Sequence, residues 1–340
     1  MDSGNCTHSI YTDFSKAFDR VDYEILLDKL SKYGVAGRAL AWIRTYLTGR
    51  RLQVRVDGHL SSEYEVISGV PQGSHLGPVL FNIFVNDIGN NFASDFLLYA
   101  DDLQIFRPIT WETDIIILQQ DINILSGWCR VNKLDLNVNK CAAVSFARSH
   151  SPIRTSYKLD RLEIAEVENI KDLGIIVDNK LTFSHHADKI TSKAFKALGF
   201  ILRRGKDFKN PWTLIRLFKS LVLPILEYGS VIWSPYTNTT IDKVEKLQRK
   251  FCKSLAYKLS SPSHICTTDE VYQCYCINKL SSRRQVADLC FFYKVVNNIT
   301  DAHEILNSFE LAPAGLTLRR NRLLKTSKSK KKLCCPWSSE

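Results

Sequence analysis

Apolar residues recur at helical spacing over much of this chain. The clearest stripe lies between residues 22 and 34, follows the i, i+3, i+4, i+7 pattern of one helix face, and ends at a glycine, a natural helix stop. Its apolar members are Tyr23, Leu26, Leu27, Leu30 and Tyr33. Similar spacing predicts helices over 38–47, 76–88, 111–131, 185–203, 212–223, 241–257 and 280–300.

Shorter runs rich in strand-forming residues lie between these stripes. Residues 7–13 are typical of a short strand that ends in Asp13, and residues 142–146 alternate apolar and other residues. Residues 52–67 and 158–183 are each typical of a hairpin. Residues 94–106 predict a strand, a two-residue turn at Asp101-Asp102 and a returning strand.

Composition bounds the class of protein. The 340 residues are 45% hydrophobic and 24% charged, which suits a globular chain of two domains. The net charge of +11 indicates a polyanionic partner, either nucleic acid or an anionic membrane surface. No run approaches the ~18–20 apolar residues that span a bilayer, and no signal peptide precedes the first strand. We therefore expect an intracellular, non-secreted chain whose ten cysteines are mostly buried thiols, with no zinc site.

Two adjacent carboxylates at the tip of an apolar hairpin have two interpretations. Aspartate is an ordinary turn residue, so Asp101 and Asp102 could form a solvated turn. Alternatively, the pair helps to hold hard divalent cations, which prefer oxygen ligands. The second interpretation requires a third carboxylate at the end of another strand, and Asp13 meets that requirement.

A loop dense in glycine and proline lies between the two acidic sites, at Gly69-Val70-Pro71-Gln72-Gly73-Ser74-His75-Leu76-Gly77-Pro78. It follows Asp13-Phe14-Ser15-Lys16-Ala17-Phe18-Asp19-Arg20-Val21 and precedes Tyr99-Ala100-Asp101-Asp102. These three stretches in this order resemble the reverse transcriptases of non-LTR (LINE-type) retrotransposons, most closely the jockey-like group.

The resemblance implies an α+β right-hand polymerase fold. We expect a palm over 1–184, with a four-stranded antiparallel sheet backed by helices, and an all-α thumb with further helices over 185–310. Residues 311–340 are strongly basic until the final glutamate, and we expect them to form a disordered tail that binds nucleic acid or directs nuclear import.

The resemblance also implies the chemistry, which is RNA-directed DNA synthesis from deoxynucleoside triphosphates (dNTP) on an RNA template and a DNA primer. Asp13, Asp101 and Asp102 would hold two Mg²⁺ ions, with Mn²⁺ as a possible substitute. Residues matching the family's nucleotide-binding positions are Phe14, Phe18, Pro71, Gln72, Gly73, Tyr99, Ala100 and Lys140. Phe18 would select deoxynucleotides by filling the space of a 2′ hydroxyl. Asp19 and Asp22 are interpreted as helix-start acids.

Basic residues provide candidate nucleic-acid contacts, although a solvated helix or strand face is the alternative. They are Arg50, Arg51, Lys189, Lys193, Lys196, Arg203 and Arg204. No membrane partner is expected, and a ribonucleoprotein of the nucleus and cytoplasm is the expected location.

The resemblance departs from the family at the N-terminus. Only twelve residues precede Asp13, where the family carries a fingers region and usually an endonuclease domain. We therefore expect a truncated polymerase that, by itself, extends primers poorly or not at all. The alternatives are a non-catalytic nucleic-acid-binding remnant and, more remotely, a nucleotide cyclase built on a similar palm.

Overall fold

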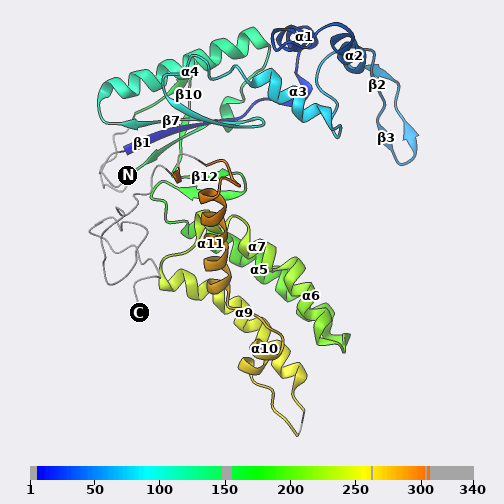
Figure 1. Cartoon of the computed structure of the whole chain (residues 1–340), viewed down its shortest axis with the longest axis vertical. Helices are drawn as coiled ribbons and strands as arrows, with labels where there is room; N and C mark the ends of the chain where they lie inside the picture. The colour runs from blue at the N-terminus through cyan, green and yellow to red at the C-terminus, as the bar shows by residue number, and fades with distance from the viewer. Residues whose placement is uncertain (1–5, 148–154, 262, 303–304, 307–340) are drawn as a thin grey trace. The chain divides into compact units, whose positions relative to one another are not determined.

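The computed structural model describes residues 6–147, 155–261, 263–302 and 305–306 and divides the chain into two compact units, Met1–Ile170 and Lys171–Glu340. Figure 1 shows the helices and strands of both units. The hairpin of β12 (Asn169–Asp172) and β13 (Ile175–Asp178) straddles this division, whereas we expected it wholly within the first domain. The basic tail predicted over 311–340 lies outside the described residues.

A five-stranded sheet forms the centre of the first unit. Its strands are β1 (Cys6–Thr12), β6 (Asp95–Tyr99), β7 (Asp102–Ile109), β8 (Ala142–Phe146) and β11 (Ala165–Glu166), in the spatial order β11-β8-β1-β7-β6. The four strands from β8 to β6 are antiparallel to their neighbours, as predicted, and the two-residue β11 adds a parallel edge to β8.

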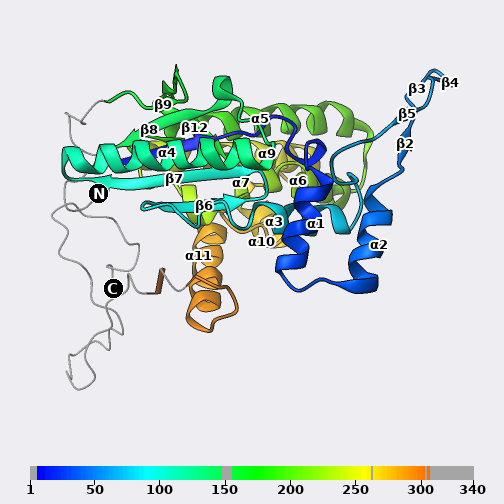
Figure 2. The same ribbon diagram turned by 90° about the horizontal axis from the view of Figure 1, so that it is seen from above.

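The two faces of β1 and β7 have different characters because side chains alternate along a strand. Ile10 and Ile105 pair with each other and are both 0% exposed, within a core that α4 (Glu112–Asn132) also enters. On the opposite face the Gln104 amide donates to Ser9 Oγ at 2.7 Å and to the Tyr11 hydroxyl at 3.2 Å. Figures 1 and 2 show α4 lying along one face of the sheet, so the polar face is the other one.

Three further helices pack within the first unit, and their positions follow the predicted stripes. They are α1 (Tyr23–Lys32), α2 (Gly37–Leu47) and α3 (Leu76–Val85). The Asp22 carboxylate caps α1 by accepting the Glu24 and Ile25 amides, both at 3.1 Å, which confirms its predicted role as a helix-start acid. α3 ends earlier than the predicted residue 88, because residues 87–91 form turns.

An exposed hairpin connects α2 to α3. Its strands are β2 (Arg51–Leu52), β3 (Arg55–Val56), β4 (His59–Leu60) and β5 (Tyr64–Glu65), paired as β2 with β5 and β3 with β4. The turn lies at Asp57-Gly58, as predicted, and both residues have positive φ. Figure 2 shows this hairpin extending away from α2. The remaining short elements of the unit are η1 (Ala17–Asp19), η2 (Val138–Lys140), β9 (Lys158–Leu159) and β10 (Leu162–Glu163).

The second unit is helical after the β12–β13 hairpin, as predicted. Its helices are α5 (Ser184–Arg204), η3 (Gly205–Asp207), α6 (Pro211–Leu221), α7 (Leu223–Glu227), α8 (Ser230–Trp233), α9 (Asn238–Leu259), α10 (Thr268–Cys274) and α11 (Leu280–Val296). The Phe218 and Phe251 rings stack at the centre of its core, 4.2 Å apart between centroids. This unit is therefore held together by apolar helix packing.

Cysteine burial differs from the expectation. Among the described residues, Cys6, Cys129, Cys141 and Cys252 are buried free thiols, but Cys274, Cys276 and Cys290 are exposed. The exposed ones lie on or beside α10 and α11 and outside the apolar core of the second unit, which explains the difference. Within the described ranges, no helix combines the length and the apolar character needed to cross a lipid bilayer.

Candidate active site

Backbone register brings two of the predicted acids to one edge of the sheet. Thr12, the last residue of β1, pairs with Leu103 of β7, so the next residues outward are Asp13 and Asp102. Leu103 and Phe14 are buried in the core, and alternation therefore turns Asp13 and Asp102 toward the polar face that carries Ser9 and Gln104. The structure thus places these two carboxylates at neighbouring strand ends.

The turn between β6 and β7 lies one residue earlier than predicted. Tyr99 pairs with Asp102, so the two turn residues are Ala100 and Asp101 and not the acid pair itself. Ala100 takes the left-handed conformation, with φ of 54°. Asp102 belongs to β7 because it pairs with Tyr99 of β6 across the turn, whereas the pairs between β7 and β1 end at Leu103. Asp101 therefore comes from the turn and Asp102 from the strand.

Lys140, which the resemblance assigned to the nucleotide phosphates, lies beside Asp13 in the structure. Its Nζ is 3.2 Å from Asp13 Oδ2, and its side chain is 64% exposed. Main-chain bonds between distant segments set this distance, since the Asn137 amide donates to Asp13 O at 2.8 Å and Phe14 bridges to Leu136. The ammonium group thus compensates the charge of Asp13 at the sheet edge.

The glycine-rich loop is joined to residues 18–21 by its backbone. The Val70 amide donates to Phe18 O, and the Gly69 amide donates to Val21 O, both at 2.8 Å. Gly69 has φ of 85°, and a Cβ there would lie 2.6 Å from Asp19 O. Only glycine fits this close approach, so the loop begins at a position fixed by the first acidic segment.

Asp19 connects the two segments through side-chain contacts as well. Its carboxylate accepts a hydrogen bond of 2.8 Å from Gln72 Nε2, and its carbonyl accepts one of 2.8 Å from Ser68 Oγ. Our interpretation of Asp19 as only a helix-start acid missed this role. Nothing in the local sequence signals it, because the partners lie about fifty positions further along the chain.

The aromatic candidates differ in exposure. Phe14 is 4% exposed and belongs to the core, so only its main chain is available to a nucleotide. Phe18 is partly buried and stacks on Phe81 of α3, with centroids 4.3 Å apart. Tyr99 is 67% exposed. Phe18 thus combines a packing role with partial exposure, while Tyr99 presents a free ring surface.

Comparison with known proteins identifies the family. The model of the family "Reverse transcriptase (RNA-dependent DNA polymerase)" matches residues 1–202. The chain belongs to this family. These 202 residues contain all three of the acidic and glycine-rich stretches described above.

Two relatives confirm the predicted likeness to non-LTR, jockey-like reverse transcriptases. The chain is 27% identical over 269 residues to the probable RNA-directed DNA polymerase from transposon X-element of Drosophila melanogaster, covering 74% of this chain and 28% of that protein. It is 29% identical over 262 residues to the RNA-directed DNA polymerase from mobile element jockey of the same species, covering 72% and 28%. The chain therefore spans under a third of the length of these relatives.

A solved structure of apo telomerase from Candida tropicalis superimposes with a TM-score of 0.41 at 12% identity, over 73% of this chain and 42% of that one.

The two arginines predicted as nucleic-acid contacts in this reverse transcriptase chain have protein partners. Arg50 donates to Leu47 O at 2.9 Å, to the Tyr23 hydroxyl at 2.7 Å and to Gly69 O at 2.5 Å, and so ties the glycine-rich loop to α1 and α2. Arg51 forms an exposed ion pair with Glu63 at 3.3 Å. Arg50 therefore has a structural role that the sequence did not indicate.

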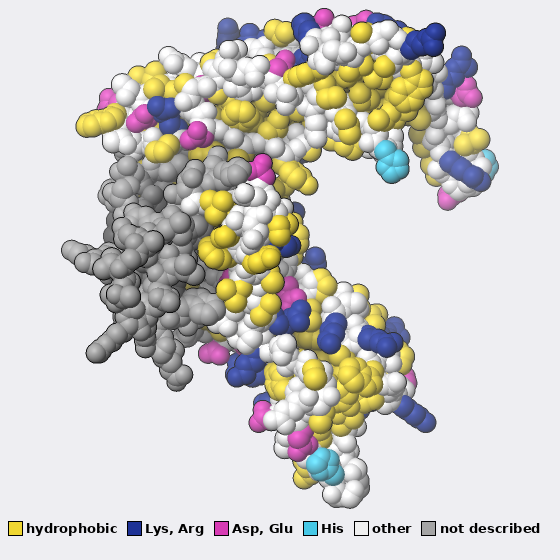
Figure 3. Space-filling view, viewed as in Figure 1, with side chains coloured by type: hydrophobic (Ala, Val, Ile, Leu, Met, Phe, Trp, Pro, Cys, Tyr) yellow, Lys and Arg dark blue, Asp and Glu magenta, His cyan; other side chains and the backbone are white. Residues whose placement is uncertain are grey.

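The basic residues predicted on the thumb share the exposed face of α5. Lys189, Lys193, Lys196, Arg203 and Arg204 are all exposed, while the buried face of the same helix carries Ala194, Leu198 and Ile201. Figure 3 shows Lys and Arg side chains of this unit interspersed with apolar ones. Such an arrangement suits a phosphate backbone, and a solvated helix face is the alternative that only a binding measurement excludes.

The donor chemistry at the sheet edge fits a divalent cation, because Asp13, Asp101 and Asp102 offer only carboxylate oxygens. In the described part of the chain, however, no three acidic, histidine or cysteine side chains are close enough to form a ready-made metal site. The three-carboxylate site stays a prediction, and Lys140 is the cation that the structure places against Asp13.

Proposed function

We propose that this chain performs RNA-directed DNA synthesis as part of the reverse transcriptase of a non-LTR mobile element. The observation that carries the proposal is the β1–β7 register, in which β1 ends at Thr12, directly before Asp13, and β7 begins at Asp102, directly before the Leu103 that pairs with Thr12. Family membership over residues 1–202 and the names of the relatives support the same activity. The substrates would be a deoxynucleoside triphosphate, a DNA primer and an RNA template.

The reaction joins the primer 3′ hydroxyl to the α-phosphate of the triphosphate, and no covalent intermediate with the protein is needed. The primer 3′ hydroxyl oxygen forms a bond to the α-phosphorus, the bond to the β-phosphate oxygen breaks, pyrophosphate leaves and the hydroxyl proton passes to solvent. Asp13, Asp101 and Asp102 would hold two Mg²⁺ ions, or Mn²⁺, which supply a lowered pKa at the attacking hydroxyl and charge compensation for the leaving group.

The chain's own residues would position the triphosphate. Lys140 pairs with Asp13 at 3.2 Å, and a cation bound to Asp13 would free its ammonium group for a phosphate oxygen. Gln72 is held by Asp19 near the start of the glycine-rich loop, where its amide would meet the nucleotide sugar. Phe18, supported by Phe81, would close the space beside the sugar C2′.

Primer extension tests the proposal. The 340-residue chain is incubated with an RNA template, a labelled DNA primer, dNTP and either Mg²⁺ or Mn²⁺, and slow extension is expected. Asp101→Asn should reduce the rate at least ~100-fold, the scale for removing a group that stabilises transition-state charge. Asp95→Asn is the matched control, because Asp95 is an exposed aspartate at the far end of β6.

Filter binding on the same samples separates this proposal from a non-catalytic nucleic-acid-binding role. Binding should weaken with salt, with each phosphate contact adding about −0.7 to −0.9 to the slope of log K against log salt. Steep binding with no extension in either metal, both by this chain and by the chain joined to an upstream fingers region, would support the binding role and contradict the polymerase. Extension that survives Asp101→Asn would contradict the assignment of Asp101.

A further inference from the structure

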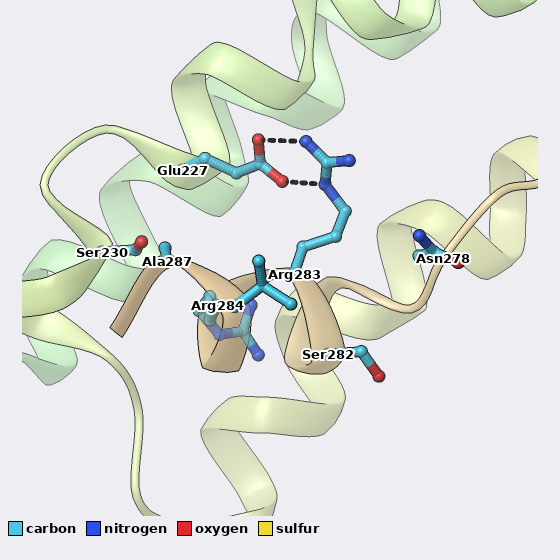
Figure 4. A pocket seen from close by; sticks show the side chains of 8 residues that line it. Glu227, Ser230, Asn278, Ser282, Arg283, Arg284 and Ala287 are labelled. Carbon is cyan, nitrogen blue, oxygen red and sulfur yellow. Dashed lines mark hydrogen bonds and ion pairs between the residues drawn. The ribbon is translucent and has the colours of Figure 1, made fainter. Parts of the chain in front are cut away.

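A pocket of about 320 Å³ lies within the second unit, where the start of α11 meets α7 and α8. Figure 4 shows its walls, with Glu227 on one side, Ser230 and Ala287 on another, and consecutive arginines on α11. Its lining residues all belong to the second unit, whereas the residues of the candidate active site belong to the first.

The two arginines of this pocket have different partners. Arg283 forms a two-bonded fork with Glu227, in which its Nη2 donates to Oε2 at 2.8 Å and its Nε donates to Oε1. The Arg284 side chain leaves the helix in another direction (Figure 4) and is only 4% exposed. Arg283 is therefore paired with a carboxylate in both directions of its fork, whereas Arg284 is buried away from that pair.

Arg284 is buried without adequate compensation. Its Nη2 is 3.8 Å from Glu245 Oε1, and its Nη1 has no hydrogen-bond partner in the described part of the chain. Glu245 is also engaged elsewhere, since its oxygens accept the amides of Ser281 at 2.6 Å and Leu280 at 3.4 Å. Burial lowers the pKa of the Arg284 guanidinium, and nearby carboxylates oppose that change. A buried charge in this state is unfavourable unless a partner is supplied.

The surroundings select the charge of a suitable partner. Glu227, Glu245 and Asp288 all interact with Arg284 through their charges. Three carboxylates around two guanidinium groups disfavour a dianion such as phosphate, whereas one singly charged oxyanion would supply the acceptor that the buried Nη1 lacks. A carboxylate also matches the planar guanidinium fork.

The surroundings also select an apolar chain beside that charge. Val286 and Ala287 line the pocket, and Val286 is 58% exposed. A ligand with an aliphatic group next to its carboxylate would contact both features at once.

We propose that the pocket containing Arg284 binds a carboxylate joined to a short aliphatic chain, either a free acid or a leucine-like C-terminus of a polypeptide. The site is independent of the polymerase reaction and uses none of its residues. Its ligand would supply the hydrogen-bond acceptor that Nη1 lacks.

Thermal unfolding of the full chain tests the proposal, with 4-methylpentanoate as the probe at constant ionic strength. At tenfold above half-saturation the melting temperature should rise by about 3–6 °C. The matched alcohol, 4-methylpentan-1-ol, and inorganic phosphate should give no saturable rise. The peptide N-acetyl-Gly-Gly-Leu tests for a polypeptide C-terminus as the ligand, and its C-terminal amide, which lacks the carboxylate, is its control. Tighter binding by the peptide acid supports a polypeptide ligand, and tighter binding by 4-methylpentanoate supports a free acid.

Two variants keep the test decisive even if a large change at position 284 prevents folding. Arg284→Lys retains the charge but not the fork, and should weaken 4-methylpentanoate binding at least tenfold. Ala287→Glu places a carboxylate three residues from Arg284 on the same helix face, so it should raise the melting temperature without ligand and abolish the response. Arg249→Gln, on the exposed surface of α9, is the control. The absence of a saturable response, an equal response in Arg284→Lys, or equally tight phosphate binding would overturn the proposal.

Discussion

The two units position their polar residues by different means. In the first unit, main-chain hydrogen bonds join segments far apart in sequence, as between Asn137 and Asp13 or between Gly69 and Val21. In the second unit, helices pack through apolar side chains such as Phe218 and Phe251, and the basic residues of α5 project from the outside. The first unit should therefore be sensitive to backbone changes near its site, and the second to changes in core volume.

The largest expected effect is in the second unit. Phe251 is 0% exposed and stacks on Phe218, so Phe251→Ala should destabilise this unit by about 3–5 kcal/mol through lost burial and a cavity. Hydrogen exchange measured by mass spectrometry should show lost protection in α6 and α9, with β1 and β7 unchanged. Phe200→Ala, at a side chain 54% exposed, is the control and should change stability by under about 1 kcal/mol. Equal loss of protection in β1 would contradict the contrast between the units.

A smaller loss of stability, caused by backbone strain and not by a cavity, is expected in the first unit. Gly69→Ala adds strain at φ of 85° and a clash with the Asp19 backbone, at a cost of about 2–4 kcal/mol. Gly34→Ala has a similar φ of 88° but open space around its Cβ, and should cost only about 1–2 kcal/mol. Urea unfolding of both variants gives the difference. If the two cost the same, the close approach of the loop to Asp19 is not a constraint.

The smallest expected loss of stability concerns the N-cap of α1, where the Asp22 side chain, and not a main-chain group, accepts the hydrogen bonds. Partial burial alone would raise the pKa of Asp22, but hydrogen bonds from Lys133 and from the Ile25 and Glu24 amides, with the charge of Lys133, lower it overall. Because the folded-state pKa lies below the unfolded value of about 3.9, this stabilisation is present above that pH and disappears as pH falls through the folded-state pKa.

Asp22→Ala should therefore cost about 1 kcal/mol at pH 7 and almost nothing once the pH is below both pKa values. Urea unfolding at several pH values provides the measurement. Asp28→Ala, which removes only an exposed ion pair within α1 to Lys32, is the control and should cost under about 0.5 kcal/mol. A cost for Asp22→Ala that does not change between pH 7 and pH 2 would show that its charge has no part in the cap.

The sequence by itself determined the elements and the family. Apolar periodicity placed α1, α4, α5 and α9 within a few residues of their bounds, because a helix must turn one apolar stripe toward a core. The order of the acidic and glycine-rich stretches identified the family that the comparison then confirmed. Asp22 was also predictable, because a helix cap depends only on neighbouring residues.

Tertiary structure alone decided the contacts between distant segments. Asp13 and Asp102 reach the same edge of the sheet because β1 pairs with β7, and that register is not written in either segment by itself. Asp19 meets Gln72, Arg50 meets Gly69, and Arg284 is buried beneath Glu245 without a partner for Nη1. Local pattern reports which residues prefer a turn, a helix or a surface. Which polar groups are buried side by side depends on packing between segments far apart in the sequence. That packing decides whether each buried group finds a hydrogen-bond partner or bears the free-energy cost of lacking one.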